Sequence, residues 1–265
     1  MLPYIVTHAK APVPIVLSIP HCGTAFPDEI KDDYHPHLAA APDDTDWFVD
    51  QLYDFAAEMG ITTIRAHYSR WVIDLNRPPD SQPLYSDGRI ITGLCPLTDF
   101  HGNSIYQKNE PDEAEVACRL ATYYFPYHRK VQELLDETKA TFGQALLWDA
   151  HSIRRFVPTI HKERFPDLIL GSADGLSAHA SLVETALAAL GSGRFGLSHN
   201  YPFKGGHITR SFGNPQAHQH ALQLEMSKEL YMDDTETQYD LPRANAIREV
   251  LRRTFHQLIQ KLQTT

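Results

Sequence analysis

Short apolar runs, some of them rich in β-branched residues, alternate along this chain with longer stretches of helical periodicity, and no other feature constrains the fold as strongly. Strands are predicted in "PIVLSIPH", "ITTIRAHY", "WVIDL", "ALLWDAH", "DLILGSA" and "HALQLEMS". Alternating strands and helices bury their apolar faces best when helices cover both faces of a sheet. We therefore expect the α/β class: a single three-layer αβα domain over residues 1–265 with a mixed, mostly parallel central sheet.

The helical stretches carry their own start and stop signals. In "DDTDWFVDQLYDFAAEMG" acidic residues come first and Gly60 is a plausible end. Its apolar residues with helical period are Trp47, Phe48, Leu52 and Phe55. The stretch "EPDEAEVACRLATYYFPYHRKVQELLDETKATFG" predicts a long helix interrupted at Pro126, and "SAHASLVETALAALG" a helix capped by Ser177. A final amphipathic helix is predicted in "DLPRANAIREVLRRTFHQLIQKLQ", whereas residues 78–110 indicate a long, functional loop.

Composition narrows the class of protein. A formal net charge of -9 argues against a general nucleic-acid or anionic-membrane surface, so we expect a small-molecule substrate. No apolar run approaches the roughly 20 residues that span a bilayer. The N-terminal segment lacks the basic and apolar regions of a signal peptide, and the 3 cysteines include no CxxC pair. These features favour a cytoplasmic protein and disfavour a thiolate zinc site. Oligomeric state is left open.

Several predicted strands end in groups that bind metals or transfer protons. They are His21, the segment from Asp74 to Arg77, His151 and Glu225. Each of them alone is more often structural, but strand ends of an α/β sheet converge at one edge. Two histidines and one carboxylate would hold zinc with one position open for water, and a further carboxylate could serve as general base.

The missing carboxylate is predicted in the acidic cluster "DDTD". Either Asp44 or Asp46 could supply it. The alternative is that these carboxylates merely complement the dipole of a helix N-terminus. The residue pattern alone leaves both interpretations open.

Seven stretches of the chain carry a more specific pattern. They are "SIPHCGTAFP", "DDTDWFVDQLYDFA", "SRWVIDLNRPPD", "LWDAHS", "GSADGLS", "NYPFKGGHITRSFGNP" and "HALQLEMSKELYMDD". In this order they resemble the N-formylglutamate amidohydrolase (deformylase) family, from about residue 14 to about residue 235. That family is related in fold to zinc carboxypeptidases and aspartoacylase, so the resemblance implies the same kind of fold here.

The resemblance also implies roles for individual residues. His21 and His151 resemble the zinc ligands, and Glu225 resembles the general base. Asn76 and Arg77 match an Asn-Arg pair that holds substrate, and Arg77 is also expected to take part in catalysis. The expected cofactor is zinc, with cobalt or manganese as substitutes.

Two departures from the wider group concern the metal ligands and a cysteine. The carboxypeptidase-type His-x-x-Glu spacing is absent, because Thr24 stands three residues after His21. The third ligand is therefore expected elsewhere, and we favour Asp46. Cys22 raises the alternative of a thiol nucleophile, which is disfavoured because adjacent strand residues point to opposite faces. By the same rule Asp149 shares a face with His151 and is expected to orient it.

A substrate with two carboxylates calls for more than one arginine, because a guanidinium grips a carboxylate through two hydrogen bonds. Arg77 is the first candidate, and Arg70, Arg154 and Arg210 are the next. For these three, a surface or strand-pairing role is an equal alternative. Arg210 belongs to the glycine-rich "GGHITR", which could close over substrate.

The resemblance implies zinc-dependent hydrolysis of N-formyl-L-glutamate to formate and L-glutamate, a step of histidine degradation. One alternative is an amidohydrolase of another N-formyl or N-acyl amino acid, since residues 78–110 and 196–216 would select the side chain. Another is a non-catalytic amino-acid-binding protein on the same fold. The presence of His21, His151 and Glu225 together weighs against the latter.

Overall fold

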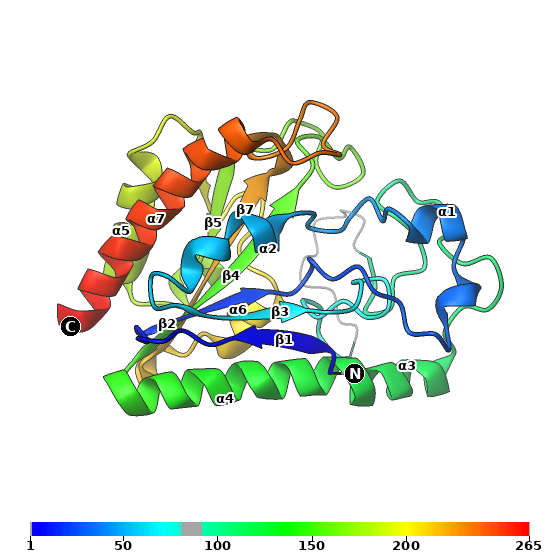
Figure 1. Cartoon of the computed structure of the whole chain (residues 1–265), viewed down its shortest axis with the longest axis horizontal. Helices are drawn as coiled ribbons and strands as arrows, with labels where there is room; N and C mark the ends of the chain where they lie inside the picture. Colours follow the sequence, from blue (N-terminus) through cyan, green and yellow to red (C-terminus); the bar gives the residue numbers. More distant parts are fainter. Residues whose placement is uncertain (1, 81–91, 265) are drawn as a thin grey trace.

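The computed structural model describes residues 2–80 and 92–264, and this part of the chain forms one seven-stranded sheet (Figure 1). The strand order is β1-β3-β2-β4-β7-β5-β6. The strands are β1 (Tyr4–Thr7), β2 (Ile15–Ile19), β3 (Thr62–Ala66), β4 (Ala145–Ile153), β5 (Leu168–Gly171), β6 (Leu197–His199) and β7 (Gln219–Ser227). The short edge strands β1 and β6 were not predicted from the sequence.

Strand directions make the sheet mixed, as expected. The central strands β3, β2, β4 and β7 are parallel to one another. β1 pairs antiparallel with β3 at one edge. On the other side β5 pairs antiparallel with β7 and parallel with β6. The carboxyl ends of the four parallel strands therefore lie along one edge of the sheet.

Helices cover both faces of the sheet (Figure 1). They are α1 (Pro36–Ala39), α2 (Val49–Leu52), α3 (Glu113–Arg119), α4 (Phe125–Phe142), α5 (Ala180–Gly191), α6 (His207–Phe212) and α7 (Leu241–Thr264). Side chains of β4 alternate between the two faces, so Trp148 packs with α5 and α7 while Leu147 packs with α4 and α6. The three-layer architecture follows from this alternation.

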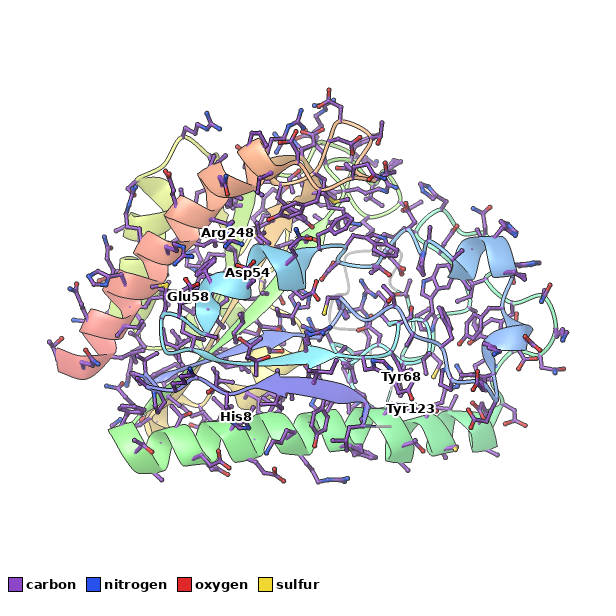
Figure 2. All side chains as sticks on the ribbon, viewed as in Figure 1. His8, Asp54, Glu58, Tyr68, Tyr123 and Arg248 are labelled. Atoms are coloured by element: carbon purple, nitrogen blue, oxygen red, sulfur yellow. The ribbon has the colours of Figure 1, made fainter. Side chains whose placement is uncertain are left out.

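The helix predicted after "DDTD" does not form as one element. It begins only at Val49, because Phe48 adopts a left-handed φ of 63°, and it is divided into α2 and a 3-10 turn, Asp54–Ala56. Arg248 of α7 donates to the carbonyls of Gln51 and Leu52, at 2.9 and 3.0 Å, and pairs with Asp54 (Figure 2). The two carbonyls thus accept hydrogen bonds from a distant side chain instead of continuing a helix.

Two other predictions were wrong for local reasons. The run "WVIDL" is buried but forms turns, with Val72 N–H bonded to Ser69 O at 2.9 Å. Ser177 does not cap α5, whose N-cap is His179. Instead Ser177 Oγ donates to Ala221 O of β7 at 2.7 Å.

The predicted interruption near Pro126 is present. A π-helical turn, Leu120–Tyr124, joins α3 to α4 just before this proline, which has no N–H to donate. α4 then ends at Gly143, whose φ is 79°. Within the described ranges, no helix has the length and apolarity that a bilayer crossing requires.

The long loop predicted at 78–110 is only partly covered by the structure. Residues 78–80 and 92–110 contain no helix and only isolated bridge pairs, which agrees with the prediction. Residues 81–91 lie outside the described residues.

Candidate metal centre

The polar strand ends converge at the carboxyl edge of the parallel strands. His21 follows β2, whereas His151 and Glu225 lie near the carboxyl end of the ladder between β4 and β7. The ladder places His151 directly beside Glu225, and neighbouring strands are about 4.8 Å apart. Their side chains therefore leave the same face of the sheet as neighbours.

His21, Asp46 and His151 bring three possible metal-ligand atoms together, and all three residues are buried. The two histidine Nδ1 atoms are 3.2 Å apart. Asp46 Oδ2 lies 3.7 Å from His21 Nδ1 and 3.3 Å from His151 Nδ1. Ligands about 2.1 Å from a tetrahedral zinc ion are about 3.4 Å from one another, so this spacing fits such an ion. Within residues 2–80 and 92–264, no other group of His, Cys, Asp and Glu does so.

Asp46, rather than Asp44, points at the histidines. Its backbone N–H donates to His21 O at 2.9 Å, and Ser152 Oγ donates to Asp46 Oδ1 at 3.3 Å. Asp46 Oδ2 is buried and has no hydrogen-bond donor. Burial acts to raise the pKa of Asp46, but the two adjacent imidazoles hold that pKa below its usual value. Asp44 faces Arg70 instead, and burial raises its pKa to about 6.

Each histidine is oriented by a carboxylate on its far side. His21 Nε2 lies 2.7 Å from Asp74 Oδ1, and His151 Nε2 lies 3.0 Å from Asp149 Oδ2. A proton on each Nε2 leaves each Nδ1 lone pair directed at the shared centre. The contact of Asp149 was predicted from the sequence, whereas that of Asp74 was not.

The pKa values of the two histidines are shifted in opposite directions. Burial and the nearby Arg70 lower the pKa of His21 to about 4. Burial also opposes protonation of His151, but Asp149 and Asp46 raise its pKa well above the usual value.

Arg70 lies behind the centre, between two buried carboxylates. Its Nη2 donates to Asp74 Oδ2 at 2.6 Å, and its Nη1 donates to the backbone oxygen of Asp44 at 3.2 Å. The side chain is only 7% exposed. Arg70 therefore supports Asp74, which in turn orients His21.

Asn76 and Arg77 lie next to the centre. Asn76 Oδ1 accepts from Ile208 N–H at 2.8 Å, which turns Asn76 Nδ2 toward His151 Nε2 at 3.0 Å. Arg77 is partly exposed and donates from Nε to Thr92 O at 3.0 Å. Its Nη1 is 3.9 Å from Asp74 Oδ2, so it stands at the rim of the same group.

The other two candidate arginines lie farther out. Arg154 pairs with Asp43, donating from Nε at 2.6 Å, and with Glu236, donating from Nη1 at 3.0 Å. Arg210 is exposed on α6 and donates from Nε to Gly205 O at 3.0 Å.

The glycine-rich segment, which could close over substrate, is partly packed into the protein. Gly205 and Gly206 are buried, and Gly206 N–H donates to Gln223 Oε1 at 2.7 Å. A Cβ atom at Gly206 would lie 2.3 Å from Asn76 Nδ2. The segment thus supports the site residues from beside them instead of covering them.

Cys22 does not have the surroundings of a nucleophile. Its thiol lies 3.5 Å from Ile19 O, and burial raises its pKa far above the usual value. A reactive cysteine needs the thiolate form, which this environment disfavours.

Glu225 completes the arrangement. It is partly exposed, unlike His21, Asp46 and His151. Burial of its carboxyl, with a smaller contribution from the charge of Asp46, raises its pKa to about 8. A carboxyl group that exchanges protons near neutral pH suits general acid-base catalysis.

A buried His-Asp-His group on the edge of an α/β sheet, with a partly exposed glutamate beside it, could hold a metal ion and transfer protons, as a hydrolase requires. Residues 13–232 match the N-formylglutamate amidohydrolase family, and the chain belongs to this family.

Individual relatives agree with this membership. The chain is 44% identical over 259 residues to an N-formylglutamate deformylase of Pseudomonas aeruginosa, covering 96% of each chain. It is 42% identical over 227 residues to one of Pseudomonas putida, covering 84% of each chain. The crystal structure of N-formylglutamate amidohydrolase from Ralstonia eutropha JMP134 has the same fold, with a TM-score of 0.81 at 24% identity over 100% of this chain and 98% of that one.

Proposed function

We propose that this protein is an N-formylglutamate deformylase that hydrolyses N-formyl-L-glutamate to formate and L-glutamate. Two relatives of that name are 44% and 42% identical to it. The observation that carries the chemistry is the spacing of His21 Nδ1, His151 Nδ1 and Asp46 Oδ2, at 3.2 to 3.7 Å from one another.

The proposed metal ligands are His21, Asp46 and His151, and zinc is the proposed metal. The orphaned Asp46 Oδ2 and the two inward-facing imidazole nitrogens fit a borderline cation better than Mg²⁺ or Ca²⁺, which prefer oxygen ligands. When bound, such an ion activates water and polarises the carbonyl oxygen of the substrate. Asp74 and Asp149 would keep both imidazoles in the tautomer that this requires.

Glu225 is the proposed general base. It would accept a proton from the attacking water and donate a proton to the nitrogen of the departing amine, so that the C–N bond breaks as formate and glutamate form. It lies beside His151 in the β4–β7 ladder, next to the proposed ligands, and its raised pKa, about 8, favours return of the proton.

Asn76 and Arg77 are the proposed substrate ligands. His151 Nε2–H would donate a hydrogen bond to Asp149, so this nitrogen would not accept from the adjacent Asn76 Nδ2. The Asn76 amide could then donate to a substrate oxygen. Arg77 stands at the rim, where its guanidinium would meet a carboxylate or the developing oxyanion. Arg70, Arg154 and Arg210 are proposed in supporting roles, because each is directed to a carboxylate or a backbone oxygen.

The test is formate release from N-formyl-L-glutamate by zinc-loaded protein, with N-formyl-L-aspartate and N-acetyl-L-glutamate as competing substrates. Clear preference for N-formyl-L-glutamate is expected. Turnover of only one of the other substrates would support the assignment as a hydrolase and contradict the assignment of N-formyl-L-glutamate as its substrate. Zinc bound at one ion per chain with no turnover of any of them would overturn the proposed reaction.

A further inference from the structure

We propose that Gln223 is a positioning residue that holds the Glu225 carboxylate in place, and that the glycine-rich segment fixes Gln223 itself. The proposal deepens the proposed function and rests on Glu225 as its general base. Gln223 lies on β7, two residues before Glu225, so both side chains leave the same face of the strand. Gln223 is buried, whereas Glu225 is partly exposed.

The orientation of the Gln223 carboxamide is determined by its partners. Gly206 N–H, which can only donate, lies 2.7 Å from one end of the group, so that end is the oxygen, Oε1. The NH₂ end must then face the opposite way, and Gln223 Nε2 lies 3.4 Å from Glu225 Oε2. A backbone group therefore forces Gln223 to present a donor to the carboxylate.

The glycine-rich segment lies close to β5 and to Asn76 because glycines stand at two contact points. Gly171 of β5 stands opposite Gln223 in the ladder, and a Cβ atom there would lie 2.6 Å from Gly205 N. A Cβ atom at Gly206 would overlap the Asn76 carboxamide. The absence of these side chains lets Gly206 N–H reach Gln223 while Ile208 N–H reaches Asn76.

Glu225 depends on Gln223 for its side-chain support. Among the hydrogen bonds of the described residues, the one to the Glu225 carboxylate comes from Gln223. Since Glu225 is partly exposed, loss of that bond would let its side chain adopt other rotamers. A general base displaced by about 1 Å loses on the order of a hundredfold in rate.

The same strand offers a matched control in Gln219. It is also a buried glutamine on this face of β7, and its Nε2 donates to Phe212 O at 2.8 Å. It is separated from Glu225 by six positions along the strand and has its own partner, Gln132. A general effect of removing a buried glutamine from β7 would therefore appear in both variants.

The first experiment compares Gln223→Met and Gln219→Met for kcat, KM and bound zinc. Gln223→Met is expected to lower kcat 10- to 100-fold, with KM changed less than about threefold and zinc unchanged. Gln219→Met should keep kcat within about twofold. Gln223→Glu, which keeps the shape and the acceptor for Gly206 but lacks the donor, serves as a second variant and should also lose kcat. Normal kcat in both Gln223 variants would overturn the proposal.

A double-mutant cycle tests whether Gln223 acts through Glu225. In a Glu225→Gln background, Gln223→Met should lower the residual rate by less than about threefold, because the base is already absent. An equal fall in both backgrounds would show a separate structural role and overturn the proposal.

Unfolding in urea provides a readout without turnover, and here Glu225→Met replaces Glu225→Gln because methionine offers no acceptor to Gln223 Nε2. The losses in midpoint of Gln223→Met and Glu225→Met should be less than additive in the double variant if the two side chains interact, and additive losses would overturn the contact. The kcat values of the single variants separate the proposed role of Glu225 from that of Gln223. A Glu225→Gln variant with normal kcat would remove the proposed base, whereas low kcat in that variant with normal kcat in Gln223→Met would remove only the present inference.

Discussion

The candidate centre is built from two kinds of backbone. His151 and Glu225 belong to β4 and β7, where a nine-residue ladder sets them side by side. Asp46, Asp74 and Asn76 lie in irregular segments between the named elements. Residues on strands inherit their position from backbone pairing, whereas residues on turns need another source of order.

Buried cations supply order on the turn side. Arg70 donates to the backbone oxygen of Asp44 at 3.2 Å, and Lys228 Nζ donates to that of Asp43 at 3.1 Å. Both side chains are buried, so the turn that carries Asp46 is attached by two desolvated hydrogen bonds from distant parts of the chain. We call His151 and Glu225 the strand half of the centre, and Asp46, Asp74 and Asn76 the turn half. Metal binding and activity should therefore depend on the side chains themselves in the strand half, and also on the supporting side chains in the turn half.

The largest effect is expected from loss of the strand-borne ligand. His151→Ala should remove bound zinc and lower kcat/KM by roughly a thousandfold or more, while the fold is retained because β4 keeps its ladder. Metal analysis and formate release measure both quantities. His256→Ala, on the exposed side of α7, should change neither. Retention of both zinc and turnover by His151→Ala would refute the assignment.

Removing the main support of the turn half should cost stability. Arg70→Met leaves the carboxylates of Asp74 and Asp44 buried without their cation, which costs about 3–5 kcal/mol of unfolding free energy. Urea denaturation measures it. Arg253→Met provides the comparison, since Arg253 is exposed and should contribute less than about 1 kcal/mol. Equal stability of the two variants would contradict the role given to Arg70.

The two carboxylates behind the histidines allow the halves to be compared directly. Asp74→Asn and Asp149→Asn should each weaken zinc binding by about 10- to 100-fold, measured by competition with a chelator. Asp74→Asn should also lower stability more than Asp149→Asn, because Asp74 pairs with Arg70 at 2.6 Å whereas Asp149 is bonded to Ser18 and Thr209. A larger loss of stability in Asp149→Asn than in Asp74→Asn would contradict the role given to Arg70 and Asp74.

The smallest effect concerns the end of β7 away from the centre. His220 is buried, and neither ring nitrogen has a hydrogen-bond partner. Burial lowers its pKa from 6.5 to about 4, so the unfolded chain binds more protons between those pH values, and stability is lost as pH falls through them. His220→Leu should raise stability by about 1 kcal/mol at pH 7 and by more at pH 5.

Urea denaturation at the two pH values, with exposed His256→Leu as control, measures the effect of His220→Leu. A gain that is the same at both pH values would show that titration of His220 does not contribute.

The site residues on strands were easier to predict from the sequence than those on turns. His151 and Glu225 were located because a short apolar run ending in a polar residue is a local pattern, and the β4–β7 ladder sets the two residues side by side. The residue pattern alone did not separate Asp44 from Asp46, because the choice depends on Arg70 and on the backbone of His21; the family resemblance favoured Asp46. Membership of the family was also readable from motifs in the sequence and is confirmed.

Apart from the contact of Asp149 with His151, the supports were beyond the reach of sequence patterns. Asp74 reaches His21 across 53 positions, and the Gly206 bond to Gln223 spans 17. The helix expected over residues 43–60 does not continue past Leu52, whose carbonyl accepts from Arg248, 196 positions away. Contacts of this range leave no periodic signal in the residues that make them.

The position of β7 in the sheet has a consequence for how the chain assembles. β7 lies between β4 and β5, and β5 and β6 join the rest of the described sheet through it. During synthesis, β1 to β4 and then β5 and β6 leave the ribosome before the strand that belongs between them. All three proposed metal ligands have emerged by then, but Glu225 arrives with β7. The strand that closes the sheet thus also delivers the proposed base, so the proposed site is completed in the step that completes the sheet, before α7 is added.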